Sequence, residues 1–167
     1  MEIDVCTSIS SSRIHFIVSP ELWECFDMNL SAIINCTWEE AKFLDLDNNI
    51  HPSMHNLPIN KGGIYVFIAK PNIIPNTHMY IMYIGRALNT QTQNLRKRCG
   101  EYYAEKRPKI KRMIESWGKY LYIRYLPLED NSQIEALERE LINRILPPFN
   151  DAIPDMEIRD AVKAFSV

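Results

Sequence analysis

Hydrophobic and polar positions alternate most regularly in the second half of the chain, where they predict a clear series of elements. Residues 63–69 and 79–84 are rich in β-branched and aromatic side chains, so each is expected to form a strand. Their connection contains two prolines and two asparagines, which favours an antiparallel hairpin. A third run of the same kind predicts a strand over residues 120–126.

Apolar residues at helical spacing predict three helices, over residues 91–104, 108–117 and 132–145. Pro108 suits the first turn of the second helix, and Gly118 suits its end. Ser132 and Glu135 match a capping box at the start of the third helix, which two prolines terminate. The order strand, strand, helix, helix, strand, helix indicates an α+β fold with a small antiparallel sheet.

The first 60 residues carry weaker signals. Residues 13–18 are expected to form a strand, and Pro20 suits the start of a short helix. Thr37 and Glu40 match a second capping box, which predicts a helix over residues 39–44.

A polar stretch at residues 45–61 contains two prolines and is expected to be a loop or a domain boundary. It divides the chain into three expected parts. These are an N-terminal α/β extension of unknown role (1–60), a main α+β domain (61–152), and a C-terminal short helix packed on that domain (153–167).

Composition narrows the class of protein. The 167 residues are 46% hydrophobic, which suits a globular chain with a real core. No apolar run reaches the roughly 18 residues of a membrane span, and the N-terminus has no apolar signal sequence. A cytoplasmic protein without a membrane partner is therefore expected. Cys6, Cys25, Cys36 and Cys99 are too widely spaced for a zinc pattern, so four free and mostly buried thiols are expected.

Charge is unevenly distributed along the chain. The whole protein carries a net charge of −2. Residues 96–124 hold ten basic and three acidic residues, a net of +7, whereas residues 1–60 hold nine acids and two bases, a net of −7. A basic stretch of this kind can bind phosphates even in a slightly acidic protein. A solvated basic helix face is an equally good interpretation of the stretch alone.

Glu138 breaks the pattern of the helix over 132–145. It lies within an apolar stripe formed by Ile134, Leu137, Leu141, Ile142 and Ile145. A buried carboxylate requires a cation or a metal ion as its partner. The alternative is a structural salt bridge, with Arg98 or Arg124 as the partner, and the stripe alone slightly favours that alternative. Arg98 itself flanks the apolar side of its helix, as a snorkelling arginine also would.

Five features in order resemble the GIY-YIG nuclease family. Both halves of its motif are present, as Gly63-Ile64-Tyr65 and Tyr83-Ile84-Gly85. Arg98 follows on a predicted helix with Tyr102 one turn later, and Glu138 precedes Asn150 by twelve residues. The resemblance covers residues 62–150 and implies a three-stranded antiparallel sheet flanked by helices. Two departures are the long 70–78 loop and Arg86 where the family often has lysine.

The resemblance also implies a site for phosphodiester hydrolysis. Glu138 would bind a single Mg²⁺ or Mn²⁺, an assignment that the resemblance favours over the salt bridge. Tyr65 would be the general base, as a phenolate or through a water. Its pKa would be lowered by nearby cations such as the metal or Arg86. Tyr83 would orient the water or the phosphate, and Arg86 would hold a phosphate.

The remaining family positions have supporting roles. Arg98 would stabilise the transition-state charge, and Tyr102 would hydrogen-bond near the phosphate. Asn150 would fix the region around Glu138. The basic residues expected to line a DNA channel are Lys97, Lys106, Arg107, Lys109, Lys111 and Arg112.

Several biological interpretations stay open at this point. The first is a DNA endonuclease of restriction, phage defence or a mobile element, acting on double-stranded DNA and forming a homodimer or cutting by successive nicks. A second is a non-catalytic nucleic-acid-binding module. A third is a nuclease in which the acidic residues 1–60 shield the basic cleft.

Overall fold

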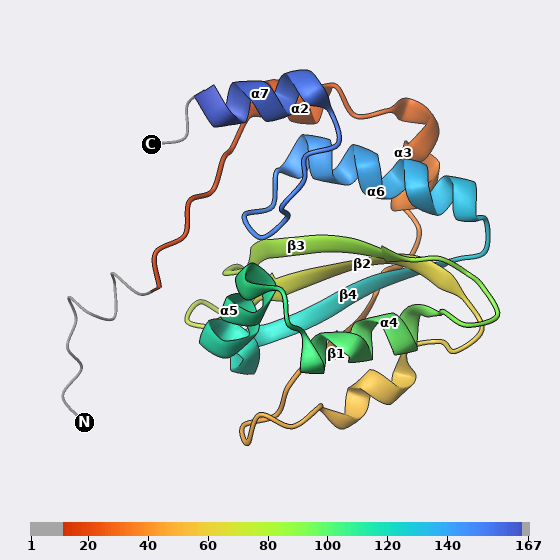
Figure 1. Cartoon of the computed structure of the whole chain (residues 1–167), viewed down its shortest axis with the longest axis vertical. Coiled ribbons are helices and arrows are strands. Elements are labelled where there is room, and N and C mark those ends of the chain that lie inside the picture. The colour runs from red at the N-terminus through yellow and green to blue at the C-terminus, as the bar shows by residue number, and fades with distance from the viewer. Residues whose placement is uncertain (1–11, 165–167) are drawn as a thin grey trace.

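The centre of the molecule is an antiparallel sheet of four strands in the order β1-β4-β2-β3 (Figure 1). A computed structural model describes residues 12–164 of the chain. The strands are β1 (Glu39–Lys42), β2 (Gly62–Ala69), β3 (Tyr80–Ala87) and β4 (Leu121–Leu128). The predicted hairpin and third strand are confirmed as β2, β3 and β4, and β3 forms one edge of the sheet.

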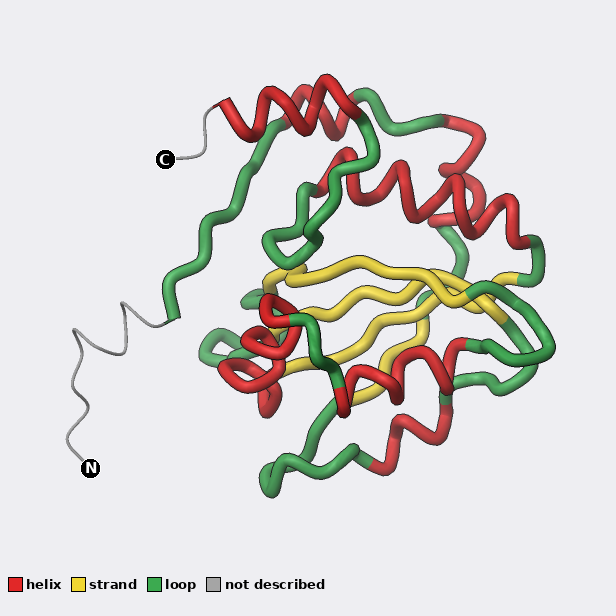
Figure 2. Tube along the Cα trace, viewed as in Figure 1, coloured by secondary structure: helices red, strands yellow, loops and turns green. Residues whose placement is uncertain are grey.

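Helices cover both faces of the sheet (Figure 2). The α-helices are α2 (Pro20–Glu24), α3 (Met28–Ile34), α4 (Leu95–Glu101), α5 (Pro108–Trp117), α6 (Asn131–Ile145) and α7 (Met156–Ala164). Short 3₁₀ helices are η1 (Pro52–Asn56), η2 (Tyr102–Ala104) and η3 (Gly118–Tyr120). α6 lies on one face of the sheet with α2 and α7 beyond it, and α4 and α5 lie on the other (Figure 1). The α+β class and the three expected helices are confirmed, although α4 begins only at Leu95.

The two faces have separate hydrophobic cores because side chains alternate along each strand. In β2, Ile64, Val66 and Ile68 pack with the apolar stripe of α6. Tyr65 and Phe67 point the other way, into a core shared with α4 and α5. Every residue of β2 is buried, as a central strand covered on both faces requires.

The expected helix over residues 39–44 is wrong, because these residues begin with strand β1. Glu39–Lys42 pairs with β4 and adds the fourth strand, where three were expected. Glu40 stands opposite Arg124 and pairs with it at 3.1 Å, and Glu39 accepts a hydrogen bond from the Tyr125 hydroxyl. These cross-strand partners satisfy the acids that resembled a helix cap.

The expected strand over residues 13–18 is also wrong. This segment has no regular secondary structure, and Phe16, Ile17 and Val18 are exposed. The boundary expected at residue 60 does not separate two packing units, because Phe43, Leu44, Met54 and Leu57 lie in the core of the α4 face.

Smaller expectations also need correction. Asp130 caps α6 in place of Ser132, because its carboxylate accepts from the backbone N–H groups of Ser132 and Gln133. Cys25 and Cys36 are exposed and only Cys99 of the described cysteines is buried, whereas Cys6 lies outside the described residues. Across residues 12–164, no helix is both long and apolar enough to cross a membrane.

Candidate active site

Three tyrosines from three elements meet on the α4 face of the sheet. Tyr65 comes from β2, Tyr83 from β3, and Tyr102 from the end of α4. The ring of Tyr102 lies 5.8 Å from each of the other two, in edge-on contacts. The hydroxyls of Tyr65 and Tyr102 are hydrogen-bonded at 2.8 Å. The fold therefore brings together three tyrosines from a segment in which the first and last are 37 positions apart.

Both motif glycines are sterically required beside this cluster. Gly63 has a φ of +148°, and a Cβ there would overlap the carbonyl of Leu126. Gly85 stands opposite Tyr65 in the β2–β3 register. A Cβ on Gly85 would lie 2.5 Å from the Tyr65 hydroxyl oxygen. Gly85 was not among the expected site residues, yet its bare backbone leaves the space that the Tyr65 hydroxyl fills.

Arg98 brings a positive charge to the tyrosines. Its Nη2 donates to the Tyr102 hydroxyl at 3.4 Å, and its Cζ lies 5.0 Å from the centre of that ring. Its Nη1 donates to Glu101 at 2.8 Å. Burial opposes the charge of Arg98, but contacts with Tyr65, Tyr102 and Glu101 raise its pKa above the ordinary value. Arg98 is therefore a permanent cation at this site.

Tyr65 and Tyr102 are neutral phenols. Burial raises the pKa of Tyr65 well above its ordinary value, and Tyr102 and Tyr83 raise it further, whereas Arg98 lowers it by less. Burial also raises the pKa of Tyr102. The net shift of the Tyr65 pKa is upward, although the nearby cation Arg98 lowers it. Tyr65 and Tyr102 are 1% exposed and Tyr83 is 9% exposed, so Tyr83 is the most accessible of the three.

Glu138 lies on the other face of the sheet, where α6 meets β3. Its side chain is 16% exposed, so the apolar stripe of α6 does carry it into a largely buried position. The carboxylate forms an ion pair and hydrogen bond with Arg86 of β3, and Glu135 lies 3.6 Å from the same guanidinium. The salt bridge considered as an alternative is thus present, with Arg86 as the partner in place of Arg98 or Arg124.

The two faces meet at the free edge of β3. Gly85 and Arg86 are neighbours in the chain and so point to opposite faces. Burial raises the pKa of Glu138, and the charges of Arg86 and Arg98 both oppose this effect. Arg98 and Glu138 therefore lie within electrostatic reach of each other, although they belong to helices on opposite faces.

The Asn150 side chain forms hydrogen bonds with the backbone at this edge. Its Oδ1 accepts from the Ile84 backbone N–H at 2.9 Å, and its Nδ2 donates to the Ile84 carbonyl at 2.8 Å. The N–H of Phe149 donates to the Met82 carbonyl at 3.0 Å. Asn150 was expected to fix the region around Glu138. Its side-chain bonds instead hold the β3 backbone between Tyr83 and Gly85.

The basic residues expected to line a channel have different partners in the fold. Their contacts are Arg107 with Glu105, Lys109 with Asp151, Lys111 with Glu115, Lys97 with the Thr92 carbonyl and Arg112 with the Arg13 carbonyl, and Lys106 is exposed. Arg107 alone of these six lies against the Tyr102 ring, 5.7 Å from its centre. No pattern in the sequence singles out Arg107 or Glu105, since only the fold brings them to the tyrosines.

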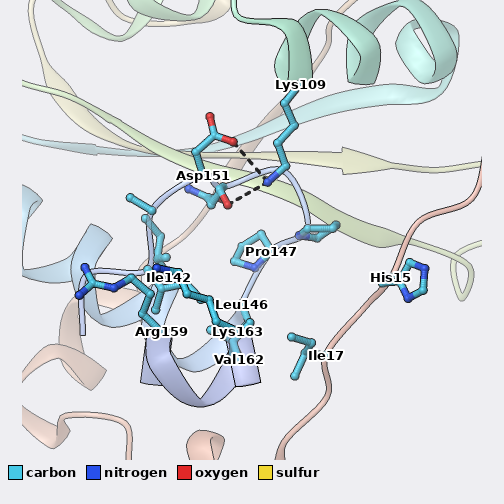
Figure 3. A pocket seen from close by; sticks show the side chains of 14 residues that line it. His15, Ile17, Lys109, Ile142, Leu146, Pro147, Asp151, Arg159, Val162 and Lys163 are labelled. Carbon is cyan, nitrogen blue, oxygen red and sulfur yellow. Dashed lines mark hydrogen bonds and ion pairs between the residues drawn. The ribbon is translucent and has the colours of Figure 1, made fainter. Parts of the chain in front are cut away.

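A cavity of about 550 Å³ lies beside the site (Figure 3). It is bounded by the end of α6, by α7, and by His15 and Ile17 of the N-terminal segment. Asn150 and Lys109 form the border that it shares with the site, and Figure 3 shows Lys109 reaching toward Asp151. The tyrosines and Glu138 do not line this cavity.

The chain matches no protein-family model, no curated protein and no solved structure. Among residues 12–164, no three His, Cys, Asp or Glu side chains gather in a group that could hold a metal ion. The expected site is of another kind, with one carboxylate and a substrate phosphate.

Proposed function

We propose that the protein is a divalent-metal-dependent nuclease of the GIY-YIG type that hydrolyses phosphodiester bonds in DNA. The observation that carries the proposal is the gathering of the motif residues at one strand edge. Tyr65, Tyr83 and Arg98 lie on one side of β3, and the Arg86–Glu138 pair lies on the other. Elements far apart in sequence supply them, and packing alone does not require charged groups at this position.

The donor set suits a hard cation. Glu135 and Glu138 lie one turn apart on α6 and both face the Arg86 guanidinium, so carboxylate oxygens already surround a positive charge there. Mg²⁺ and Mn²⁺ prefer such oxygen donors and keep several waters. Glu138 is the residue that would hold the ion. When bound, the ion would neutralise charge at the scissile phosphate.

The tyrosines have different roles in this proposal. Tyr83 is the least buried of the three phenols, at 9% exposed, and faces the substrate, where its hydroxyl orients the attacking water or the phosphate. Tyr65 is too deeply buried to ionise readily, so it acts as a neutral phenol that holds the Tyr102 hydroxyl. Arg98 stabilises the negative charge that develops on the phosphate.

The decisive experiment is incubation of supercoiled plasmid and of single-stranded DNA with the protein, with and without Mg²⁺ or Mn²⁺. Metal-dependent nicking is expected, and Glu138→Gln should lower its rate roughly 100-fold or more. Glu140→Gln is the matched control, because Glu140 is 14% exposed on the same helix and pairs with Arg144 at 2.8 Å. Cleavage by Glu138→Gln at the rate of Glu140→Gln would remove Glu138 from the mechanism.

A second candidate function is a non-catalytic nucleic-acid-binding module. The observation that favours it is the Arg86–Glu138 pair, which already satisfies the carboxylate without a metal. DNA binding without cleavage under any metal condition would support this alternative. Shielding by the acidic N-terminal residues has less support, because Glu40 pairs with Arg124 and Lys70 at the sheet.

A further inference from the structure

Two guanidinium groups lie against the ring of one tyrosine. The Cζ atoms of Arg98 and Arg107 are 5.0 and 5.7 Å from the centre of the Tyr102 ring. Arg98 belongs to α4, whereas Arg107 is the residue that precedes α5. Like charges repel, so two cations beside one phenol need a reason in the fold or in a ligand.

Neighbouring acids hold both guanidinium groups in place. Arg98 pairs with Glu101 at 2.8 Å, and Arg107 pairs with Glu105 through two nitrogen atoms, at 3.0 and 2.6 Å. The Glu105 side chain is only 13% exposed, and its backbone contacts with Lys106 and Arg107 fix it further. Arg107 is therefore an oriented cation and not a freely moving surface side chain.

Both cations lie beside the Tyr102 side chain. Arg98 donates a hydrogen bond to the Tyr102 hydroxyl. The pKa of Arg107 is raised above its ordinary value, mainly by the hydrogen bond with Glu105 and further by interactions with Tyr102 and Tyr83, whereas burial lowers it. The Tyr102 phenol is neutral, because burial raises its pKa, and so it does not cancel the two charges. Arg98 is 29% exposed and Arg107 is 43% exposed, so each side chain is partly open to solvent or to a ligand.

We infer that Arg98 and Arg107 bind one phosphate group between them, with Arg107 as a second phosphate-binding arm of the site. A planar guanidinium binds two phosphate oxygens at once, and a phosphodiester presents two charged oxygens to such a pair. The ring of Tyr83 lies 5.8 Å from that of Tyr102 and so beside the same position. The nucleic-acid identity of the ligand rests on the proposed function, whereas binding of the anion does not depend on hydrolysis.

The first test measures DNA binding without cleavage, by fluorescence anisotropy of a labelled duplex in EDTA over a range of salt concentrations. Arg107→Ala should weaken binding about tenfold and reduce the salt slope by about one. Arg139→Ala is the control, since it removes the same charge from an exposed position on α6. Arg107→Lys should recover only part of the affinity, because lysine cannot bind two oxygens in the same plane.

Coupling between the two arms separates a shared phosphate from two independent contacts. The Arg98→Ala/Arg107→Ala double variant should lose less affinity than the two single losses predict together, because both arms serve one phosphate. A titration with inorganic phosphate, followed by NMR of the arginine Nε–H groups, should shift the signals of Arg98 and Arg107 together. Two results would overturn the inference. One is that the Arg107→Ala variant binds DNA as tightly as the Arg139→Ala variant, and the other is that the losses of affinity are additive in the double variant.

The outcomes also separate this inference from the proposed function. Coupled binding by the two arginines without any metal-dependent cleavage would leave the anion site standing and remove the nuclease activity. Cleavage that requires Glu138 but does not change when Arg107 is replaced would support the nuclease activity and remove the proposed role of Arg107. In an active enzyme, Arg107→Ala should raise KM more than it lowers kcat, because its contact is made in the ground state as well.

Discussion

The two faces of the sheet at β3 differ in the burial and charge of the residues that they bring to the site. On the α4 face, Tyr65 and Tyr102 are buried, neutral and hydrogen-bonded to each other. On the α6 face, Arg86 and Glu138 are charged, and they meet at the rim of an apolar helix stripe. Neutral phenols can be packed deep in a core at small cost, whereas charges stay where a partner or solvent reaches them.

This difference indicates where chemistry can occur. Only the edge of β3 gives access to both sets of groups, since consecutive residues of one strand point to the two faces. Gly85 and Asn150 shape that edge, one by leaving space and the other by holding the backbone. The most informative variants therefore disturb one face or the junction while leaving the other intact.

The largest effect is expected from Gly85→Ala, which disturbs the junction itself. The new Cβ would lie 2.5 Å from the Tyr65 hydroxyl oxygen, so the buried ring must move and its bond to Tyr102 must lengthen or break. We expect a loss of about 1–3 kcal/mol in the free energy of unfolding, with loss of cleavage. Urea denaturation and the plasmid assay measure the two effects.

Gly100→Ala is the matched control for this substitution. Gly100 lies in α4, and a Cβ there meets nothing within 4 Å. Alanine should stabilise this helix by about 0.5–1 kcal/mol and leave activity unchanged. Equal behaviour of the two alanine variants would show that the tyrosine packing does not depend on space at Gly85.

Sequence patterns predicted the parts of this molecule that depend on local signals. Residues 63–69 gave a strand because both of its faces are buried and the run is therefore continuously apolar. The position of Glu138 in an apolar stripe predicted its burial for the same reason. Its partner was not predictable, because Arg86 lies 52 residues away and only strand pairing brings it to α6.

Strand β1 shows why the remaining features were missed. Glu39–Lys42 has no strand-like composition, and its acids are satisfied by Arg124 and Tyr125 across the sheet. Tertiary partners of this kind override local propensity. Arg107 was expected to belong to a helix face that binds DNA, yet the Glu105 contact turns it toward the tyrosines.

The next effect in size is expected from Asn150→Ala, which opens the free edge of β3. The substitution removes two hydrogen bonds to Ile84 and leaves that strand backbone unpaired, at a cost of about 1–3 kcal/mol. Hydrogen exchange at the Ile84 amide should accelerate. Asn143→Ala is the control, because buried Asn143 holds the Asp155 backbone near α7 and should leave Ile84 protected.

A smaller effect is expected from breaking the charged pair of the α6 face. A double-mutant cycle with Arg86→Ala and Glu138→Ala should give a coupling energy of roughly 0.5–3 kcal/mol in urea denaturation. The Arg144–Glu140 pair provides the comparison, since it is intact within α6 at 2.8 Å. Both pairs should couple in stability, but only the first should affect DNA cleavage. Loss of activity from both cycles would mean that α6 acts through its stability alone.

The smallest effect is expected at the rim of the tyrosine face, where Glu105 holds Arg107. The hydrogen bonds from Arg107 lower the pKa of Glu105 to about 2, from an ordinary value of 4.5. A depressed folded-state pKa stabilises the protein above the ordinary pKa, and this contribution fades as the pH falls toward about 2. Because Arg107 is 43% exposed, solvent screens the pair, and about 1 kcal/mol or less is expected.

Glu105→Gln tests this contribution, since glutamine keeps the shape and an acceptor oxygen but not the charge. Thermal unfolding of the two proteins should differ by a constant amount at pH 5–7, and the difference should shrink as the pH falls from 4.5 to 3. High salt should reduce the difference at pH 6 by screening the pair. A difference that is independent of pH would mean that Glu105 acts only through its backbone hydrogen bonds. Arg107 would then be held at the tyrosines by its contact with the Tyr102 ring and not by the charge of Glu105.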